Sequence, residues 1–285
     1  MKRTDFRHLE PLRVRWAEID AQGIVFNGHY LTYFDTAISG YWRALAIPYA
    51  DTMKSLGGDL YVRRATLDYR APARYDDRLV IGIRCRQLGN SSMTVDGAIF
   101  QGDQLLVQAE LIYVFADPSS QTSQRLPDPL RRLIEDFEAG QSVVEVTLGT
   151  WAELGEAASS IRRQVFIDEQ RIPAELEFDL ADADCVHALA CNRFGLPLAT
   201  GRLLEHVPGM AKIGRMAVLR AMRGGQIGRQ VLEALMEEAK RQGDREVLLH
   251  AQLSAESFYL RAGFQRRGQP FEEAGIGHVE MIKAL

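Results

Sequence analysis

The chain has few cysteines, no long apolar run and no strong charge of either sign, and each absence argues against a class of protein function. Its three cysteines, Cys85, Cys185 and Cys191, are scattered without metal-ligand spacing, which indicates a reducing compartment and no metal site. No apolar stretch approaches a membrane span, and residues 1–16 lack the apolar core of a secretion signal. A net charge of −4 gives no basic footprint for nucleic acid. These features predict a soluble, cytoplasmic protein with neither membrane nor nucleic acid as partner.

The length of 285 residues is sufficient for two domains of ordinary size. A polar, loop-like segment at residues 117–124 and a short helical pattern ending at Glu138 are followed by the flexible joint Ala139-Gly140-Gln141-Ser142. We therefore expect a first domain at residues 1–138 and a second at residues 139–285.

The first half combines one very apolar helix with a series of strands. The helix begins near Asn27-Gly28, and its apolar residues recur at spacings of three and four: Tyr30, Phe34, Ala37, Ile38, Tyr41 and Leu45. A shorter helix is expected from Tyr49 to Leu56. Alternating patterns predict strands at residues 12–16, 60–69, 79–85, 93–99 and 105–115. Because glycine-containing turns separate the later strands, the simplest fold is a curved antiparallel sheet wrapped around the long helix.

The residues before this helix resemble a known signature. Arg15-Trp16-Ala17-Glu18-Ile19-Asp20-Ala21-Gln22-Gly23-Ile24-Val25, followed by Tyr30-Leu31-Thr32-Tyr33-Phe34, is similar to the hotdog-fold acyl-CoA thioesterases of the 4-hydroxybenzoyl-CoA thioesterase type. The resemblance covers nearly the whole half. It implies that Asp20 is the catalytic nucleophile or general base, and that the protein is a homodimer or homotetramer with sites between subunits.

The chemistry of thioester hydrolysis agrees with these residue types. A carboxylate attacks the thioester or activates water, and a hydrogen-bond donor stabilises the developing oxyanion. Free N–H groups near Gly28 are suitable donors, and Asn27 or His29 is expected to hold the water or the carbonyl. Many members of the resembled family carry histidine where Asn27 stands.

Each of these residues also has a structural alternative. Asp20 fits a plain turn, Asn27 fits a helix cap, and His29 fits a structural position in the first helical turn. Glu18 is expected on a solvated turn. Arg63 and Arg64 fit either CoA phosphates or a solvated strand face.

In the second half, strands and helices alternate, which predicts an α/β domain. Strands are expected at residues 143–148, 187–191, 198–204, 213–218 and 247–251, and helices at 160–170, from the glycine turn to Gly243, and around 257–260.

A glycine-rich turn between a strand and a helix is the strongest binding signal in this half. It consists of Arg223, Gly224, Gly225, Gln226, Ile227 and Gly228, with Arg229 in the helix that follows. Glycines allow close approach of a ligand, and the free N–H groups and dipole of a helix N-terminus favour an anion such as a pyrophosphate. The spacing fits neither common nucleotide-binding signature.

This turn resembles motif A of the GNAT acetyltransferases, Gln/Arg-x-x-Gly-x-Gly/Ala. Gln226 departs from it, because the family usually has glycine there and a Cβ intrudes on the pyrophosphate. Further segments, including Phe258-Tyr259-Leu260-Arg261-Ala262-Gly263-Phe264, are similar to the small ElaA-type GNAT proteins.

The GNAT resemblance implies roles for individual residues. Acetyl-CoA or acyl-CoA would pair its pantetheine arm with the backbone of Met216, Ala217 and Val218. Tyr259 would protonate the leaving thiolate, unless it is a plain core aromatic. Apart from the resemblance, acyl transfer to an amine needs a base that deprotonates the amine. Glu205, at the end of its strand, fits either this base or a solvated strand end, and His250 and His278 either border the acceptor pocket or are structural.

Both resemblances concern proteins that handle acyl-CoA. The sequence therefore predicts a bifunctional enzyme, an acyl-CoA thioester hydrolase followed by an acetyl-CoA-dependent N-acyltransferase whose acceptor is an unidentified amine. Two alternatives remain open: a GNAT acyltransferase with a non-catalytic hotdog dimerisation domain, and a non-enzymatic acyl-CoA sensor.

Overall fold

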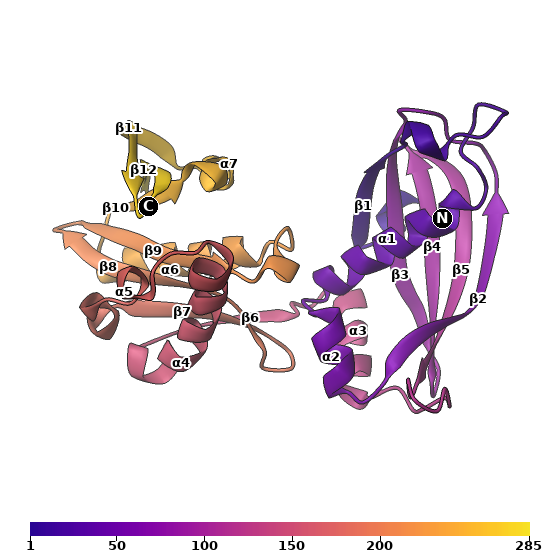
Figure 1. Ribbon diagram of the computed structural model, residues 1–285, viewed down its shortest axis with the longest axis horizontal. Coiled ribbons are helices and arrows are strands. Elements are labelled where there is room, and N and C mark those ends of the chain that lie inside the picture. Colours follow the sequence, from indigo (N-terminus) through magenta and orange to yellow (C-terminus); the bar gives the residue numbers. More distant parts are fainter. The chain divides into compact units, whose positions relative to one another are not determined.

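The computed structural model describes residues 1–285 and divides into two compact units, Met1–Val143 and Val144–Leu285. Each unit has its own sheet, of five strands in the first and seven in the second (Figure 1). No helix in either unit combines the length and the apolar character needed to cross a membrane.

The first unit is an antiparallel sheet with a long helix across one face, which confirms the predicted hotdog arrangement. The sheet order is β1-β3-β4-β5-β2, so β1 and β2 are the two edges. The elements are η1 (Arg3–Asp5), β1 (His8–Arg13), η2 (Trp16–Glu18), α1 (His29–Ala44), α2 (Tyr49–Ser55), β2 (Asp59–Tyr69), β3 (Arg78–Leu88), β4 (Ser92–Gln101), β5 (Gln104–Ala116) and α3 (Asp128–Glu138).

The first strand begins and ends earlier than the sequence suggested. The alternation of Leu12, Val14 and Trp16 favoured a strand over residues 12–16, but β1 ends at Arg13. Val14 is buried, whereas Trp16 is 75% exposed and packs edge-on against Tyr75. The alternation is therefore accidental beyond Val14, and the chain turns into η2.

The predicted apolar stripe of α1 is confirmed as the centre of the first core. All six of its residues are buried: Tyr30, Phe34, Ala37, Ile38, Tyr41 and Leu45. The helix lies close to the sheet because Gly97 of β4 has no side chain. A Cβ at Gly97 would lie 2.6 Å from a ring carbon of Phe34. Each large apolar side chain buried here contributes roughly 1.5–3 kcal/mol relative to exposure.

Helix α3 is attached to the first unit by its last residue, Glu138. The hydroxyl of Tyr41 donates to the Glu138 carboxylate at 2.6 Å, and the backbone N–H of Cys85 donates to it at 2.7 Å. Burial raises the pKa of Glu138 despite these two hydrogen bonds. Glu138 therefore joins α3 to both α1 and β3.

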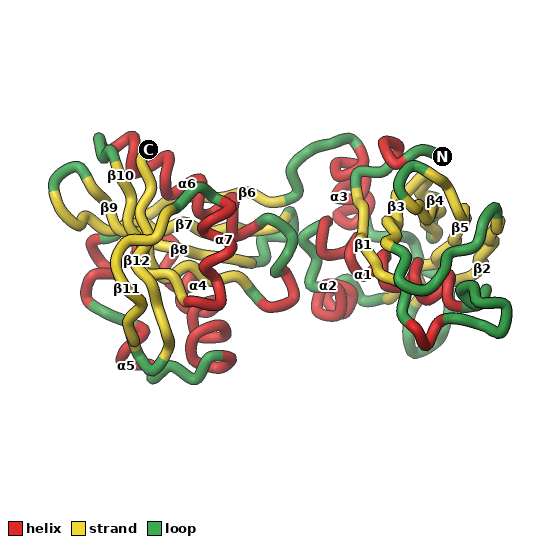
Figure 2. Tube along the Cα trace, turned by 90° about the horizontal axis from the view of Figure 1, so that it is seen from above, coloured by secondary structure: helices red, strands yellow, loops and turns green.

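The second unit is a mixed sheet of order β11-β12-β10-β9-β8-β7-β6, in which only β9 and β10 are parallel. Figure 2 shows α6 and α4 on opposite sides of its central strands. The elements are β6 (Val144–Gly149), α4 (Trp151–Arg162), η3 (Arg163–Glu169), α5 (Ala174–Glu177), η4 (Leu180–Asp184), β7 (Val186–Asn192), β8 (Pro197–Val207), β9 (Met210–Val218), η5 (Arg220–Met222), α6 (Ile227–Gln242), β10 (Glu246–Gln252), η6 (Leu253–Ala255), α7 (Glu256–Arg261), β11 (Gln265–Glu273) and β12 (Ile276–Ala284).

The first helix of this unit starts nine residues before its predicted start at Ser160. Helix α4 begins at Trp151, and Thr150 forms a capping interaction with Glu153, whose carboxylate accepts from the Thr150 N–H at 2.8 Å. That Thr-x-x-Glu spacing is a helix-start signal that the helical period alone does not reveal. From Arg163 the helix widens into the π-helical segment η3.

A buried ion-pair cluster holds α4, α5, η4 and β8 together. Arg162 is 1% exposed and donates to the carboxylates of Glu177 at 2.6 Å and Asp182 at 2.7 Å. Arg202 of β8 also donates to Asp182, at 2.7 Å. Arg215 of β9 approaches Glu177 at 3.3 Å. The cluster therefore fixes the segment between α4 and β7 against the sheet.

Candidate active sites

Asp20 lies in a tight turn that fixes one of its carboxylate oxygens. Its Oδ1 accepts backbone N–H groups from Gln22 at 2.8 Å and Ile24 at 3.5 Å. Gly23 closes the turn with a φ of +75°, a conformation that favours glycine. The residue is half-buried, and Oδ2 has no hydrogen-bond partner. One oxygen thus orients the carboxylate while the other stays available for chemistry.

The N-terminus of α1 presents free backbone donors. The N–H of His29 donates to the Phe26 carbonyl at 2.9 Å, and that of Leu31 to the Gly28 carbonyl at 3.2 Å. The N–H groups of Gly28 and Tyr30 have no partner. Such unpaired donors at a helix N-terminus suit a developing oxyanion.

Asn27 is not the helix cap that the sequence allowed as an alternative. The N-cap position is Gly28, and no side chain caps the helix. Asn27 is exposed, and its carbonyl accepts from the Tyr69 hydroxyl at 3.2 Å. His29 is half-buried with its ring edge-on to Phe26, the centroids 5.9 Å apart. Both side chains therefore lie at the start of α1.

The expectation of a solvated turn at Glu18 is wrong. Glu18 is 4% exposed and accepts from the Arg15 N–H and from the Tyr33 hydroxyl, each at 2.7 Å. Burial raises the pKa of Glu18, but these hydrogen bonds and the Arg15 guanidinium together hold it below its ordinary value. Glu18 is therefore a buried carboxylate that positions the turn.

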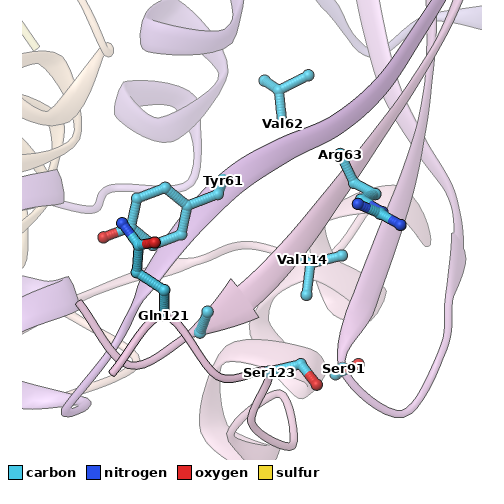
Figure 3. Close-up of a pocket in the computed structure, with 8 residues that line it drawn as sticks. Tyr61, Val62, Arg63, Ser91, Val114, Gln121 and Ser123 are labelled. Atoms are coloured by element: carbon cyan, nitrogen blue, oxygen red, sulfur yellow. The ribbon is translucent and has the colours of Figure 1, made fainter. Parts of the chain in front are cut away.

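A cavity of about 600 Å³ lies at the start of β2 (Figure 3). Its lining residues are Tyr61, Val62, Arg63, Ser91, Val114, Ala116, Gln121 and Ser123. Tyr69, which contacts Asn27, lies at the other end of β2, roughly 20–25 Å away at the usual rise of a strand.

The two arginines of β2 differ in availability. Arg63 lines the cavity, whereas Arg64 donates to Glu110 at 2.6 Å on the sheet surface. Only Arg63 of this pair faces a space that a ligand can enter. Sequence reasoning missed the serines and Gln121, because they meet Arg63 only through the pairing of distant strands.

In the second unit, β9 has an unpaired edge after its midpoint. It pairs with β10 only up to Ile213 and Leu249. On its other side it stays paired with β8 as far as Val218, with a bulge at Arg215, whose φ is +50°. No strand therefore pairs with the edge of β9 that faces β10 from Gly214 to Val218, a stretch that includes the predicted Met216, Ala217 and Val218. The Val218 carbonyl accepts from Arg223 Nε at 3.1 Å.

The glycine-rich turn joins this edge to α6 and carries several free donors. Gly224 has a φ of +87° and Gln226 a φ of +65°, so Gln226 occupies the left-handed region that glycine prefers. The N–H groups of Gly224, Gln226, Ile227 and Gly228 have no partner. Gly225 donates weakly to the Met222 carbonyl, at 3.4 Å. The turn thus has the backbone geometry of an anion site.

Both predicted arginines of this loop are already paired with carboxylates. The Arg223 guanidinium forms a bidentate pair with Glu169 of η3, at 2.6 and 2.7 Å, and its Nε donates to the Val218 carbonyl at 3.1 Å. Arg229 donates to Glu233 one helical turn later, at 2.7 Å. The free donors of the loop are therefore those of its backbone.

Tyr259 lies on α7 and is 7% exposed. Its ring packs edge-on against Phe258 and Phe264, with centroids 4.9 and 5.8 Å away. Burial raises the pKa of Tyr259 to about 12. Its hydroxyl has no hydrogen-bond partner, so at neutral pH it is a proton donor without an acceptor.

The remaining polar candidates of the second unit differ in their exposure and in their hydrogen-bond partners. Glu205 is exposed near the end of β8. His278 is tied to its own strand, with Nδ1 2.8 Å from the Ile276 carbonyl. His250 lies 3.2 Å from Glu273, a partner 23 residues later that sequence reasoning did not identify. The structure contains no group of three or more His, Cys, Asp or Glu side chains placed to hold a metal ion.

The first unit has a hotdog fold and the second a GNAT-like α/β fold, and two family models match the corresponding parts of the chain. Residues 22–108 match the thioesterase superfamily, and residues 182–285 match the acetyltransferase (GNAT) domain. The chain belongs to the thioesterase superfamily through its first unit and to the GNAT family through its second.

Three curated relatives are similar to parts of the chain. The uncharacterized protein YyaT of Bacillus subtilis is 37% identical over 139 residues, 48% of this chain and 92% of the relative. The uncharacterized N-acetyltransferase YjcF of Bacillus subtilis is 32% identical over 124 residues, 43% of this chain and 87% of the relative. The acyl-CoA thioester hydrolase YbgC of Escherichia coli is 30% identical over 129 residues, 45% of this chain and 93% of the relative.

Proposed function

We propose that the protein is a bifunctional acyl-CoA-using enzyme, which hydrolyses acyl-CoA in its first unit and transfers an acyl group to an amine in its second. The main support is that each unit combines a reactive side-chain oxygen that has no hydrogen-bond partner with unpaired backbone N–H donors. In the first these are Asp20 and the Gly28 N–H, and in the second Tyr259 and the N–H groups of the glycine-rich turn.

In the proposed hydrolase, Asp20 attacks the thioester carbonyl or takes a proton from an attacking water. The Gly28 N–H stabilises the oxyanion. The exposed amide of Asn27 and the ring of His29 lie at the same helix start and orient the water or the carbonyl. No side chain of this mechanism needs a metal ion.

We propose that the edge of β2 forms a homodimer. This strand pairs only with β5, and Tyr61, Val62 and Tyr69 along it are 43%, 55% and 49% exposed. Antiparallel pairing of two β2 edges brings the start of one strand to the end of the other. The cavity beside Arg63 would then receive the CoA or acyl portion of a thioester held at the partner's Asp20.

In the proposed acyltransferase, the pantetheine arm of acetyl-CoA pairs with the open backbone of Met216, Ala217 and Val218. The pyrophosphate binds the free N–H groups between Gly224 and Gly228. Tyr259 donates its proton to the thiolate as the carbon–sulfur bond breaks. Because the Tyr259 pKa is raised to about 12, the hydroxyl remains protonated before the thiolate forms.

The test asks whether a substitution in each unit removes the activity of that unit and leaves the other activity intact. Free thiol release is measured over a panel of acyl-CoAs, with and without a panel of amines, for the wild type, Asp20→Asn and Tyr259→Phe. Asp20→Asn is expected to abolish release without amine and to leave amine-dependent release intact. Tyr259→Phe is expected to leave release without amine intact and to lower amine-dependent release by roughly 100-fold.

The other outcomes identify the alternatives. Amine-dependent release alone, insensitive to Asp20→Asn, would leave the hotdog unit as a dimerisation domain. Tight acyl-CoA binding without any release would indicate a sensor. Either result would contradict the bifunctional proposal. A monomer at micromolar concentration in analytical ultracentrifugation would contradict the β2 dimer.

A further inference from the structure

His250 lies where the open edge of β9 begins. Leu249 is the last residue of β10 paired with β9, so His250 is the first residue beyond the closed part of the sheet. Neighbouring strands lie roughly 4.8 Å apart, which places His250 beside Gly214 and the bulge at Arg215. If the pyrophosphate binds the glycine-rich turn, the sulfur end of the pantetheine points toward this bulge.

The ring of His250 is held in one orientation. Its Nδ1 lies 3.2 Å from a Glu273 oxygen on β11, and its ring packs edge-on against Phe271 at 4.9 Å. The Nε2 lies 3.8 Å from Glu280, beyond hydrogen-bond distance. Nδ1 also lies 3.5 Å from the Lys212 ammonium, which can only donate, so the contacts with Glu273 and Lys212 require opposite tautomers of His250. The shorter contact with Glu273 favours a proton on Nδ1, and this tautomer leaves Nε2 free to accept another.

Charged groups surround this histidine from every neighbouring strand. Lys212 of β9 lies 3.5 Å from Nδ1, Glu273 comes from β11 and Glu280 from β12. Arg267 pairs with Glu280, and His206 and His278 lie near Glu280 and Glu273 respectively.

Glu273 remains ionised at neutral pH. Burial raises its pKa, but the hydrogen bond with His250 and the nearby positive charges lower it further, so the net shift is downward. An ionised carboxylate is the partner that fixes a histidine tautomer and stabilises the imidazolium once a proton is taken.

We propose that His250, positioned by Glu273, is the general base that deprotonates the acceptor amine of the second unit. This inference rests on the proposed acyltransferase function and adds the residue that starts the reaction. Gln252, two residues further on the same face of β10, bonds to Gln170 at the end of η3, at 2.8 Å. The end of η3 therefore covers this face next to His250, which leaves the histidine at the boundary of an acceptor site.

An acceptor that arrives as an ammonium ion gives one proton to Nε2 of His250, which later passes it to water. The neutral nitrogen forms the C–N bond as the C–S bond breaks. The nitrogen loses a second proton to solvent when the amide forms. The thiolate takes a proton from the Tyr259 hydroxyl, and solvent returns a proton to Tyr259. The products are an amide, free CoA and one proton.

The test compares pH profiles of kcat/KM for amine-dependent thiol release from acetyl-CoA. The variants are His250→Asn, Glu273→Gln and, as a matched control for the second, Glu237→Gln at an exposed position of α6. The acceptors are spermidine, lysine, phenethylamine, glucosamine and hydroxylamine, with enzyme-free blanks. Hydroxylamine arrives largely neutral, so it needs no base to become reactive.

His250→Asn is expected to lower kcat/KM for the ammonium-forming acceptors by roughly 100-fold or more, the usual size of general-base catalysis. It should also flatten the acid limb of the profile, and the loss should be much smaller with hydroxylamine. Glu273→Gln should lower the rate less than His250→Asn does, because it removes only the group that orients the base, and Glu237→Gln should change neither rate nor profile. Acetyl-CoA affinity, measured by calorimetry, should stay unchanged in all three.

Two results would overturn the proposal and are distinguishable. If the wild type acylates an amine but His250→Asn keeps its rate and acid limb, His250 is not the base while the acyltransferase function stands. If no amine raises thiol release by the wild type above its amine-free rate, the acyltransferase function fails and the role of His250 fails with it. An equal loss with hydroxylamine and spermidine would indicate a structural effect and would also contradict the role of a base.

Discussion

Replacing Arg162 by methionine tests how much the buried ion-pair cluster contributes to the second unit. Methionine keeps most of the side-chain length and removes the charge. Arg162 donates four hydrogen bonds, to the two carboxylates and to the Glu177 carbonyl, at 2.6 to 3.1 Å. Its loss leaves Glu177 and Asp182 buried without one of their cations.

The expected cost follows from what remains in the cluster. Removing one member of a buried ion pair costs about 3–5 kcal/mol, because the other charge stays buried. Arg202 still pairs with Asp182, and Arg215 with Glu177, so we expect the lower end, about 3 kcal/mol. At an m-value of about 2 kcal/mol/M, the urea midpoint of this unit would fall by about 1.5 M.

The matched control is Arg229→Met, because Arg229 forms an exposed pair with Glu233 in the same unit. Exposed pairs contribute about 0.3–0.5 kcal/mol at this helical spacing. Hydrogen-exchange mass spectrometry along a urea gradient, with peptides from β8, reports the second unit separately from the first. A loss below 1 kcal/mol for Arg162→Met, or one equal to that of Arg229→Met, would refute the reasoning.

Three further outcomes are expected. Gln226→Gly should stabilise the second unit by about 1 kcal/mol in the same urea experiment, because it relieves a left-handed residue; a destabilised variant would contradict this. The pKa of Glu18 is lower in the folded state, so its ionised carboxylate stabilises the fold fully above the unfolded pKa, and this stabilisation is lost as pH falls through the folded pKa. In Glu18→Gln, acid unfolding of the first unit should therefore depend less on pH. Acid unfolding identical to that of the wild type would contradict this prediction. Tyr259→Phe should lower kcat for amine acylation by roughly 100-fold with unchanged acetyl-CoA affinity in calorimetry, since it removes only a proton donor; an unchanged kcat would exclude that role.

The fold could be predicted where the determining pattern is local. The stripe from Tyr30 to Leu45 and the glycine-rich turn before α6 are short-range patterns, and the structure has the helix and the loop that they predict. The β11 strand could not be predicted, because all of its residues are exposed and it has no alternation of buried and exposed positions.

The sites were less predictable because their contacts are long-range. In the sequence Glu18 looks like a turn residue, and only the fold shows that it accepts a hydrogen bond from the Tyr33 hydroxyl. Likewise, Glu169 and Arg223 form their ion pair although they lie 54 residues apart in the sequence. By contrast, the Arg229–Glu233 pair is readable from its helical spacing alone. Residue type and spacing thus predicted the candidate sites, whereas the partners of Glu18 and Arg223 could be identified only from the structure.

The pairing of Arg223 with Glu169 gives the loop beside α6 an internal competitor for its ligand. A phosphate that approaches Arg223 must displace a carboxylate already bound by two hydrogen bonds. One small anion gains little from that exchange, whereas a ligand with several linked phosphates also engages the backbone donors nearby. The Glu169 carboxylate would therefore favour a ligand with several linked phosphates over free phosphate at this loop.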